Sequence, residues 1–302
     1  MPEIIHPKDE KHWLDLRCLD VTSTESAALF GVSPYITKFE LWHNKKDRHV
    51  VDINPNERMK WGTRLQNSIA DGIAEDKDWQ IRRMDEYMRL PDLRMGSSFD
   101  FAIENNGILE VKNVDSFAFK DGWLVNDGEV EAPPHIEIQV QHQLAVSQRK
   151  FAYIGALIGG NRVVLIKREP IPKVIESIKE KVKNFWLSIE ENLCPSPDFP
   201  RDAKFISRLY SYAEKGKTIN VNGSDFKALA EDYRNLSKEK KELSEKMDSV
   251  KAQILMKIGD ASKVIGDKYT ITASMVPPKK ISYTREEYRT FRINWKKEKK
   301  DA

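Results

Sequence analysis

The stretch that most constrains the fold is GSSFDFAIENNGILEVKN, residues 96–113. Two apolar segments, each short enough for a strand, flank an Asn-Asn-Gly sequence that is typical of a tight turn. Side chains two residues apart in a strand share a face, so Glu110 and Lys112 lie on one face while Leu109 and Val111 lie on the other. The stretch therefore predicts an antiparallel hairpin with one charged and one apolar face.

The length of the turn decides which face carries Asp100. A two-residue loop at 106–107 pairs Ile103 with Glu110 and leaves Asp100 on the face opposite the other two charges. The charges are then divided between the two faces.

A three-residue loop at 105–107 pairs Ala102 with Glu110 and Asp100 with Lys112. Gly107 then takes the left-handed position that this loop needs. We favour this register because it gathers all three charges. It also leaves one apolar face intact, made of Phe99, Phe101, Ile103, Leu109 and Val111.

Two carboxylates and an ammonium on rigid strands suit a particular chemistry. Mg²⁺ prefers one or two carboxylates plus water, and a nearby lysine can orient or deprotonate an attacking water and offset charge on a phosphoryl group. The face predicts metal-assisted phosphodiester hydrolysis. The alternative is an exposed hairpin face whose Asp–Lys pair contributes well under ~1 kcal/mol.

Composition narrows the class of protein. The 302 residues suffice for one large domain or two modest ones, and the net charge of +3 permits a nucleic-acid partner without indicating one. Cys18 and Cys194 lie far apart, which excludes a zinc or iron–sulfur site built from four cysteines. Residues 1–30 lack a signal-peptide pattern and no apolar run reaches about 18 residues, so we expect a cytoplasmic protein.

The rest of the first two hundred residues alternates helix and strand signals. A short helix capped by Thr22 or Ser23 ends at Gly31, and a second follows Pro34. An amphipathic helix spans 57–77. After the hairpin we expect a helix from 135 to 147, two strands around Gly159-Gly160-Asn161, and a further helix over 174–189.

The Pro-rich segment 194–202 marks a boundary between a core, residues 1–200, and an extension, residues 201–302. Apolar residues from 226 to 254 follow a three-four spacing interrupted by Lys240, which predicts a helix about 45–50 Å long. We expect a small hairpin over 269–283 and a short basic helix at the end of the chain. The long helix can pack on its own core, pair with a partner or grip DNA.

Five motifs in order resemble one family. An Arg precedes a hydroxyl residue by seven positions, and WGTRL, SSFD, a strand with ExK and a helix opening QVQHQL follow. This order resembles the phage lambda-type exonucleases, or YqaJ-like viral recombinases, of the PD-(D/E)XK nuclease superfamily. It covers roughly residues 13–190. The resemblance implies an α/β (α+β) fold, a restriction-endonuclease-like core with a mixed sheet flanked by helices, and a mainly helical extension.

The resemblance also implies roles for the active-site residues. By motif match, Asp100, Glu110 and the backbone carbonyl of Val111 hold Mg²⁺, for which Mn²⁺ can substitute, and Lys112 is the catalytic lysine. Gln139 opens the following helix and matches an active-site glutamine. Its alternative role is a solvent-facing helix residue.

The resemblance also implies residues that bind the DNA end, and the chain differs from the family pattern at two positions. Arg17, Thr24 and Ser98 match residues that bind a terminal 5′-phosphate, with Thr24 where serine is more usual. Thr24 can instead support the first turn of its helix. Gln66 stands where many relatives carry a catalytic glutamate, and Phe99 replaces the proline of the superfamily motif.

The implied function is a Mg²⁺-dependent 5′-to-3′ exonuclease on double-stranded DNA. It leaves 3′ single strands for recombination by strand annealing, acts as a homotrimer and works with a single-strand annealing protein in a bacterial or phage-infected cell. Two alternatives remain: a restriction-like endonuclease of the same superfamily, and a non-catalytic DNA-end-binding or scaffold protein.

Overall fold

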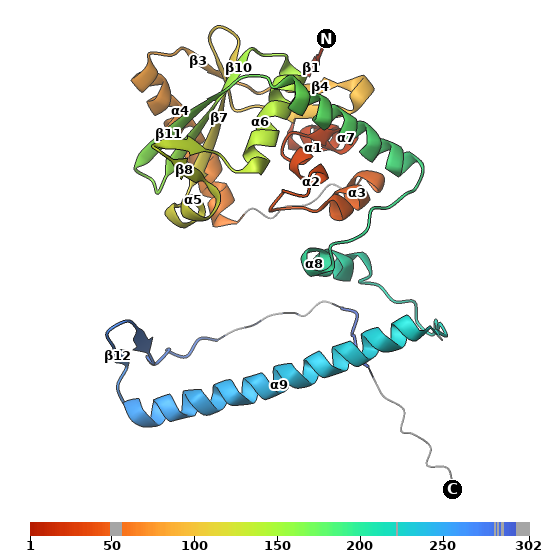
Figure 1. Cartoon of the computed structure of the whole chain (residues 1–302), viewed down its shortest axis with the longest axis vertical. Helices are drawn as coiled ribbons and strands as arrows, with labels where there is room; N and C mark the ends of the chain where they lie inside the picture. The colour runs from red at the N-terminus through yellow and green to blue at the C-terminus, as the bar shows by residue number, and fades with distance from the viewer. Residues whose placement is uncertain (49–55, 222, 281, 283, 285–286, 294–302) are drawn as a thin grey trace. The chain divides into compact units, whose positions relative to one another are not determined.

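The computed structural model describes residues 1–48, 56–221, 223–280, 282, 284 and 287–293 (Figure 1). The chain divides into two compact units, Met1–Ile206 and Ser207–Ala302. Each unit is considered by itself below.

A five-stranded sheet is the centre of the first unit, with strand order β11-β10-β7-β6-β3. Strands β7 and β10 pair in parallel and the other neighbours pair antiparallel, so the sheet is mixed. The strand bounds are β3 Ile81–Arg83, β6 Phe101–Ile103, β7 Gly107–Val114, β10 Phe151–Ile158 and β11 Arg162–Arg168.

A second sheet has four strands in the order β1-β4-β5-β2. Strand β5 ends at Ser98, and the chain passes through Phe99 and Asp100 directly into β6 of the larger sheet. Ser98 and Asp100 therefore lie at the junction between the two sheets. The bounds are β1 Glu3–Ile5, β2 Val21–Thr22, β4 Tyr87–Leu90 and β5 Met95–Ser98.

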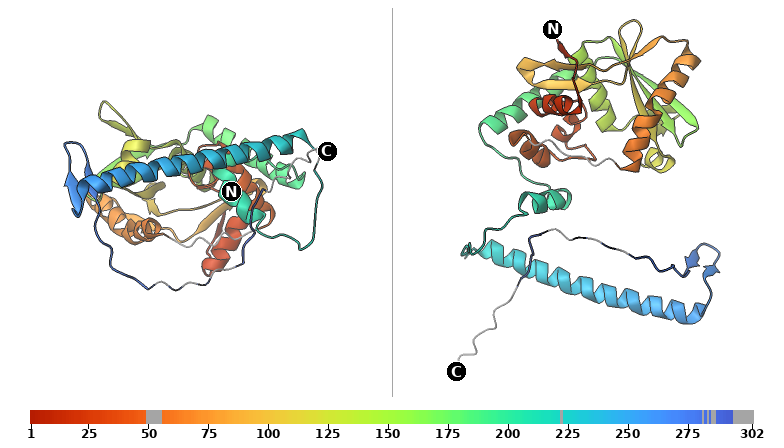
Figure 2. Two further views of the ribbon diagram at one scale, coloured as in Figure 1. Left: turned by 90° about the horizontal axis from the view of Figure 1, so that it is seen from below. Right: turned by 180° about the vertical axis from the view of Figure 1, so that it is seen from behind.

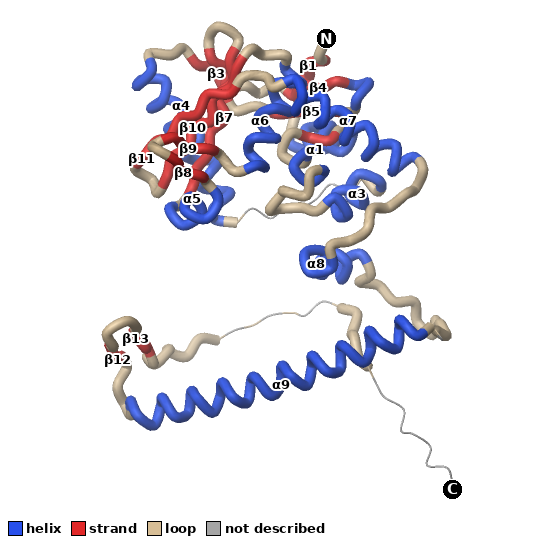
Figure 3. The backbone as a smooth tube through the Cα atoms, viewed as in Figure 1, coloured by secondary structure: helices blue, strands red, loops and turns tan. Residues whose placement is uncertain are grey.

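Helices cover both faces of the five-stranded sheet (Figures 1 and 3). Helix α4 (Glu57–Lys77) buries Ile69 and Ile73 against Phe101 and Leu109. Helices α6 (Pro134–Ser147) and α7 (Pro172–Glu190) belong to the core on the other face, where Val140 and Phe185 are fully buried. The prediction of a mixed sheet flanked by helices is confirmed.

Shorter elements complete this unit. They are α1 Glu10–Leu19, α2 Ser26–Leu29, α3 Lys38–Lys46, the 3-10 helix η1 Pro91–Leu93, α5 Ser116–Gly122, β8 Leu124–Asn126, β9 Glu129–Glu131 and α8 Phe199–Leu209. Helix α2 starts later than predicted and neither Thr22 nor Ser23 caps it. The Glu25 carboxylate instead accepts the backbone N–H of Thr22 at 2.8 Å. Gly31, with φ of 73°, ends this helix as predicted.

The hairpin register differs from the predicted one by two residues. Phe101 pairs with Leu109 and Ile103 with Gly107, so the loop is 104–106. The left-handed positions belong to Asn105 and Asn106, with φ of 60° and 71°, and not to Gly107. Gly107 is needed for another reason, since a Cβ there would lie 2.2 Å from the Phe151 ring.

A shift of two residues keeps every side chain on its face, because side chains alternate with a period of two. Phe101, Ile103, Leu109 and Val111 accordingly share one apolar cluster, as predicted. Phe99 does not, because it precedes β6 and packs in the core cluster on the other side of the sheet. Placing Phe99 on the apolar hairpin face was wrong.

The second unit contains helix α9 (Ser224–Ile258), which both views of Figure 2 show as one uninterrupted rod. A small antiparallel hairpin follows, formed by β12 Lys263–Ile265 and β13 Thr270–Thr272. This hairpin lies upstream of the predicted one, because the second strand pairs with KVI rather than with residues beyond the two prolines. The predicted basic helix ends in WKKEKKDA, within residues 294–302, which lie outside the described part of the chain.

Within the described ranges, no helix is both long enough and apolar enough to cross a membrane.

Candidate active site

The hairpin brings Asp100 and Glu110 together from two neighbouring strands. Asp100 immediately precedes β6, and the observed register places it across from Glu110 on β7. The Asp100 carboxylate accepts the backbone N–H of Val111 at 2.7 Å and a hydrogen bond from Gln66 at 2.5 Å. The Asp100 side chain is therefore held against the β7 backbone, beside the ExK sequence.

Glu110 is buried, at 4% exposure. One of its oxygens accepts from the Lys112 ammonium at 2.5 Å and from Gln139 at 2.6 Å. The other accepts from Gln143 at 2.7 Å. A buried carboxylate with three donors is fixed in one orientation, as a metal ligand must be.

Lys112 also donates to the Gln139 amide oxygen at 3.2 Å. Burial lowers the pKa of Lys112, but the charges of Glu110 and Asp100 outweigh burial, and the pKa ends above its ordinary value. Lys112 is therefore a cation in this arrangement.

Burial, followed by the nearby charge of Glu110, raises the pKa of Asp100 from 3.8 to about 7. Lys112 and the hydrogen bonds from Val111 and Gln66 oppose this rise without cancelling it. Two carboxylates this close favour a proton or a cation between them.

The structure places the predicted active-site residues in two adjacent hydrogen-bonded groups, Gln66 with Asp100, and Lys112 and Gln139 with Glu110. The bond from the Val111 N–H to Asp100 holds the first group beside the second. Gln66 belongs to α4 and Gln139 to α6, so two different helices contribute a glutamine to the charged face of the hairpin. Gln139 is buried, at 7% exposure, and does not face solvent.

Sequence reasoning missed Gln143. It lies one turn after Gln139 on α6 and donates to Glu110, while its amide oxygen is buried without a hydrogen-bond partner. The spacing of four residues after Gln139 could have found it, because such positions share a helix face. Its unpaired oxygen is an acceptor available to water or to a hydrated cation at the site.

The three residues assigned to a 5′-phosphate lie near one another. Trp13 on α1 donates its indole N–H to Ser98 at 2.8 Å, and its ring lies 4.8 Å from the Arg17 guanidinium carbon. Thr24 is exposed, with its hydroxyl 3.3 Å from that of Thr22.

A second link ties the Thr24 segment to β5. Ser23, the residue before Thr24, accepts from Ser97, the residue before Ser98, at 2.9 Å. The buried Lys45 pairs with Glu25 at 2.7 Å and donates to the Arg17 carbonyl. The sequence held no spacing signal for Lys45, because α3 brings it in from elsewhere in the chain.

The residues present fit a hard divalent cation. The site offers two carboxylates and amide oxygens, which are ligands of the kind such a cation prefers. It is not a cluster of three or more His, Cys, Asp or Glu residues, and no such cluster suitable for a metal occurs in the described part of the chain. Mg²⁺ commonly uses one or two carboxylates and completes its shell with water and substrate phosphate. Asp100, Glu110 and the Val111 carbonyl are the groups that would hold it.

The chain is similar to known proteins in sequence and in fold. Residues 12–150 match the model of the YqaJ-like viral recombinase domain. This segment is similar to the YqaJ-like viral recombinase domain. The match contains both carboxylates, Lys112 and all three glutamines of the site, and it confirms the resemblance seen in the motifs. The chain is also 24% identical over 255 residues to the uncharacterized protein YqaJ of Bacillus subtilis, which covers 82% of this chain and 78% of that protein.

Two solved structures share the fold. The alkaline exonuclease LHK-Exo of Laribacter hongkongensis aligns with a TM-score of 0.50 and 15% identity, over 66% of this chain and 99% of the other. LHK-Exo in complex with dAMP aligns with a TM-score of 0.51 and 17% identity, over 65% and 99% of the two chains. About two thirds of the chain thus shares the fold of this exonuclease.

Proposed function

We propose that this protein is a Mg²⁺-dependent deoxyribonuclease that digests one strand of duplex DNA from its 5′ end. The observation that carries the proposal is the cluster of Asp100, Glu110 and Lys112 around the start of β6 and the middle of β7. The exonuclease fold of the YqaJ-like domain supports the same reaction.

The residues have distinct roles in this proposal. Asp100 and Glu110, with the Val111 carbonyl, would hold the metal, and Mg²⁺ bound there would supply charge to polarise the scissile phosphate and lower the pKa of an attacking water. Lys112 stays protonated, donates to the phosphate or the attacking water and offsets charge in the transition state. The new P–O bond forms as the P–O3′ bond breaks, and the 3′ oxygen takes a proton.

The direction of digestion would follow from how the DNA end is held. Arg17 can fork onto two phosphate oxygens, and the Ser98 hydroxyl lies only two residues before Asp100. A 5′-phosphate held by Arg17, Thr24 and Ser98 would keep the terminal nucleotide beside the carboxylates. The remaining strand is then a 3′ overhang for annealing.

The wider setting belongs to the same proposal. Mn²⁺ would substitute for Mg²⁺, because both accept carboxylate and carbonyl oxygens. By resemblance, the protein would act as a homotrimer in the cytoplasm of a bacterial or phage-infected cell, together with a single-strand annealing protein.

Digestion of blunt duplex DNA, labelled at either end, tests the activity. We expect loss of the 5′ label in MgCl₂, slower loss without the 5′-phosphate, and at least ~10³-fold slower digestion by Lys112→Ala. Lys183→Ala, on the exposed face of α7, is the matched control. Equal loss of activity in both variants, or no loss of the 5′ label by the wild type, would refute the proposal.

A covalently closed circle separates the alternatives. An end-dependent enzyme leaves the circle intact, whereas a restriction-like endonuclease linearises it. A non-catalytic DNA-end-binding or scaffold protein binds the linear duplex and digests neither substrate in any divalent metal.

A further inference from the structure

Helix α9 carries an exposed apolar stripe along its whole length. The stripe consists of the residues at three-four spacing, namely Phe226, Leu229, Tyr233, Leu236, Leu243, Met247, Val250 and Ile254. Phe226, Leu236 and Leu243 are 60–63% exposed, and Phe291 contacts Tyr233 without covering it. A soluble helix of this kind normally buries such a stripe against another element.

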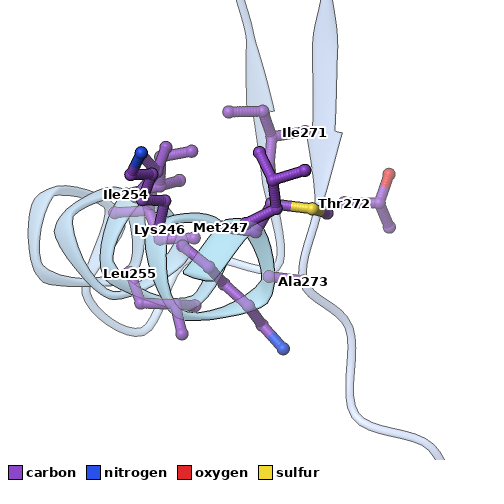
Figure 4. Close-up of a pocket in the computed structure, with 11 residues that line it drawn as sticks. Lys246, Met247, Ile254, Leu255, Ile271, Thr272 and Ala273 are labelled. Carbon is purple, nitrogen blue, oxygen red and sulfur yellow. The ribbon is translucent and has the colours of Figure 1, made fainter. Parts of the chain in front are cut away.

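The second half of the stripe forms one wall of a groove. Leu243, Met247, Val250 and Ile254 line a cavity of about 550 Å³, and β13 forms the opposite wall (Figure 4). Met247 remains 73% exposed and Val250 55% exposed beside the hairpin, so the groove is open. The first half of the stripe carries the bulky side chains that fit such a groove, among them Leu229, Tyr233 and Leu236.

The charged residues beside the stripe favour one orientation of a partner helix over the other. The residues that flank it are acidic in the first half, at Asp225, Asp232 and Glu239, and basic in the second half, at Lys246 and Lys251. Two parallel copies would place like charges together, Lys246 against Lys251 and Lys240 against its own counterpart in the stripe. Two antiparallel copies place the acidic half of each helix against the basic half of the other.

We propose that α9 is a self-association surface that pairs with α9 of a second copy as an antiparallel coiled coil, a two-fold contact separate from those that would build a homotrimer. With the helices fully overlapped, Leu229 meets Ile254 of the second copy, and Tyr233 meets Val250. Leu236 then meets Met247, so the bulky half of each stripe fills the groove of the other. The stripe spans more than four heptads, which is long enough for a stable coiled coil.

Lys240 fits this arrangement better than the parallel one. Its opposite residue in the antiparallel pair is Leu243, over which the lysine stem can lie while its ammonium reaches solvent. Glu239 of one copy then approaches Lys246 of the other. The single polar position fixes the orientation at some cost in stability, a known use of such residues in coiled coils.

Cysteine cross-linking tests the pairing in the full-length chain. Two variants, Leu229→Cys and Ile254→Cys, are made in a background in which Cys18 and Cys194 are serine. We expect disulfide-linked dimers when the two variants are mixed and oxidised, and almost none from either variant alone. A parallel pair would give the opposite result. No cross-link in any mixture would show that the stripe is covered in another way, and either outcome overturns the proposal.

A charge placed in the stripe tests its contribution. Leu236→Asp should weaken self-association at least about 100-fold, as seen in the concentration dependence of the mass from light scattering. Ala252→Asp adds the same charge on the opposite, exposed side of α9 and should leave the mass unchanged. Nuclease activity of both variants should equal that of the wild type, so the result of this test does not depend on the catalytic proposal. Equal masses for Leu236→Asp and the wild type would overturn the inference.

Discussion

Asp100 occupies a place where a carboxylate is costly to the fold. Because burial and then Glu110 raise its pKa from 3.8 to about 7, the folded chain holds a proton there that the unfolded chain releases. The native state therefore binds more protons than the unfolded state between these two pH values. The free energy of unfolding accordingly decreases as pH rises from about 4 to 7, and a bound cation reverses this cost.

Asp100→Asn should stabilise the metal-free protein at pH 8, by about 2–4 °C in Tm, and should change Tm little at pH 4. The asparagine oxygen can still accept from Val111, and Gln66 can turn its amide so that its oxygen accepts from the new amide N–H. MgCl₂ should raise the Tm of the wild type and not that of the variant. Thermal unfolding in EDTA and in MgCl₂ at both pH values checks this. A lower Tm for the variant at pH 8 in EDTA would contradict it.

Gln66 is within hydrogen-bonding distance of Asp100, so a charge at this position would act directly on the metal site. Gln66→Glu should tighten Mg²⁺ binding about tenfold, because a third carboxylate adds charge to the ligand set. It should lower Tm without metal. Calorimetric titration with MgCl₂ measures the affinity. Asn67→Asp adds the same charge one residue later, where the side chain bonds Arg83, and should leave the affinity unchanged.

The sequence could predict that Asp100 and Glu110 share a face, because this depends only on the alternation of side chains along each strand. The predicted register was wrong by two residues, yet Asp100 and Glu110 still share a face, as strand alternation requires. The position of Gly107 could not be predicted, because the ring that crowds it comes from Phe151 on a strand paired through tertiary structure. Turn chemistry alone pointed to a left-handed glycine instead.

At the scale of elements, helix α6 positions the site with one face and anchors itself with another. Gln139 and Gln143 donate to Glu110, whereas Gln141 bonds the carbonyl of Glu169 and the N–H of Ile171, in the connection between β11 and α7. One face of α6 therefore orients Glu110 and the other anchors the helix, and substitutions can separate the two roles.

Gln143→Ala should weaken Mg²⁺ binding or activity about 10- to 100-fold, since it removes the donor that orients one oxygen of Glu110. Gln141→Ala should leave Mg²⁺ affinity unchanged and lower the free energy of unfolding by about 0.5–1.5 kcal/mol, because it removes the hydrogen bonds that anchor α6 to the connection between β11 and α7. Titration with MgCl₂ and denaturant unfolding of both variants separate the effects. Equal Mg²⁺ affinity for the two variants would show that Gln143 does not orient the carboxylate.

Elements with strong local signals were predictable, and elements set by long-range pairing were not. Helix α4 spans residues 57–77, as its four-residue repeat predicted, and two glycines join β10 to β11 as expected. Strand β12 escaped prediction because KVI is too short to show alternation. Only its pairing with residues 270–272 makes it a strand.

At the scale of the whole molecule, helix α8 packs against the rest of the first unit, although it begins within the proline-rich segment that suggested a boundary. Asp202 on α8 is fully buried, where it accepts from the Thr37 hydroxyl at 2.5 Å and from the N–H of Asp198 at 2.7 Å. Thr37 in turn caps α3 by accepting from Glu40. Phe205 packs edge-on against Phe39 on the same helix. These contacts lie within the compact unit that ends at Ile206.

Two truncations decide where the core ends. A chain ending at residue 206 should fold and digest duplex DNA like the full protein, because it retains every residue of the catalytic cluster and the contacts of Asp202. A chain ending at 198 should be less stable by at least about 1–3 kcal/mol, since the buried side of α3 loses the partner of Thr37 and the ring of Phe205. Thermal and denaturant unfolding measure the difference. Asp202→Ala in the longer chain should reproduce part of it, which separates the buried hydrogen bonds from the loss of chain length. Equal stability of the two truncations would mean that α8 contributes nothing to the core and that the domain ends before it.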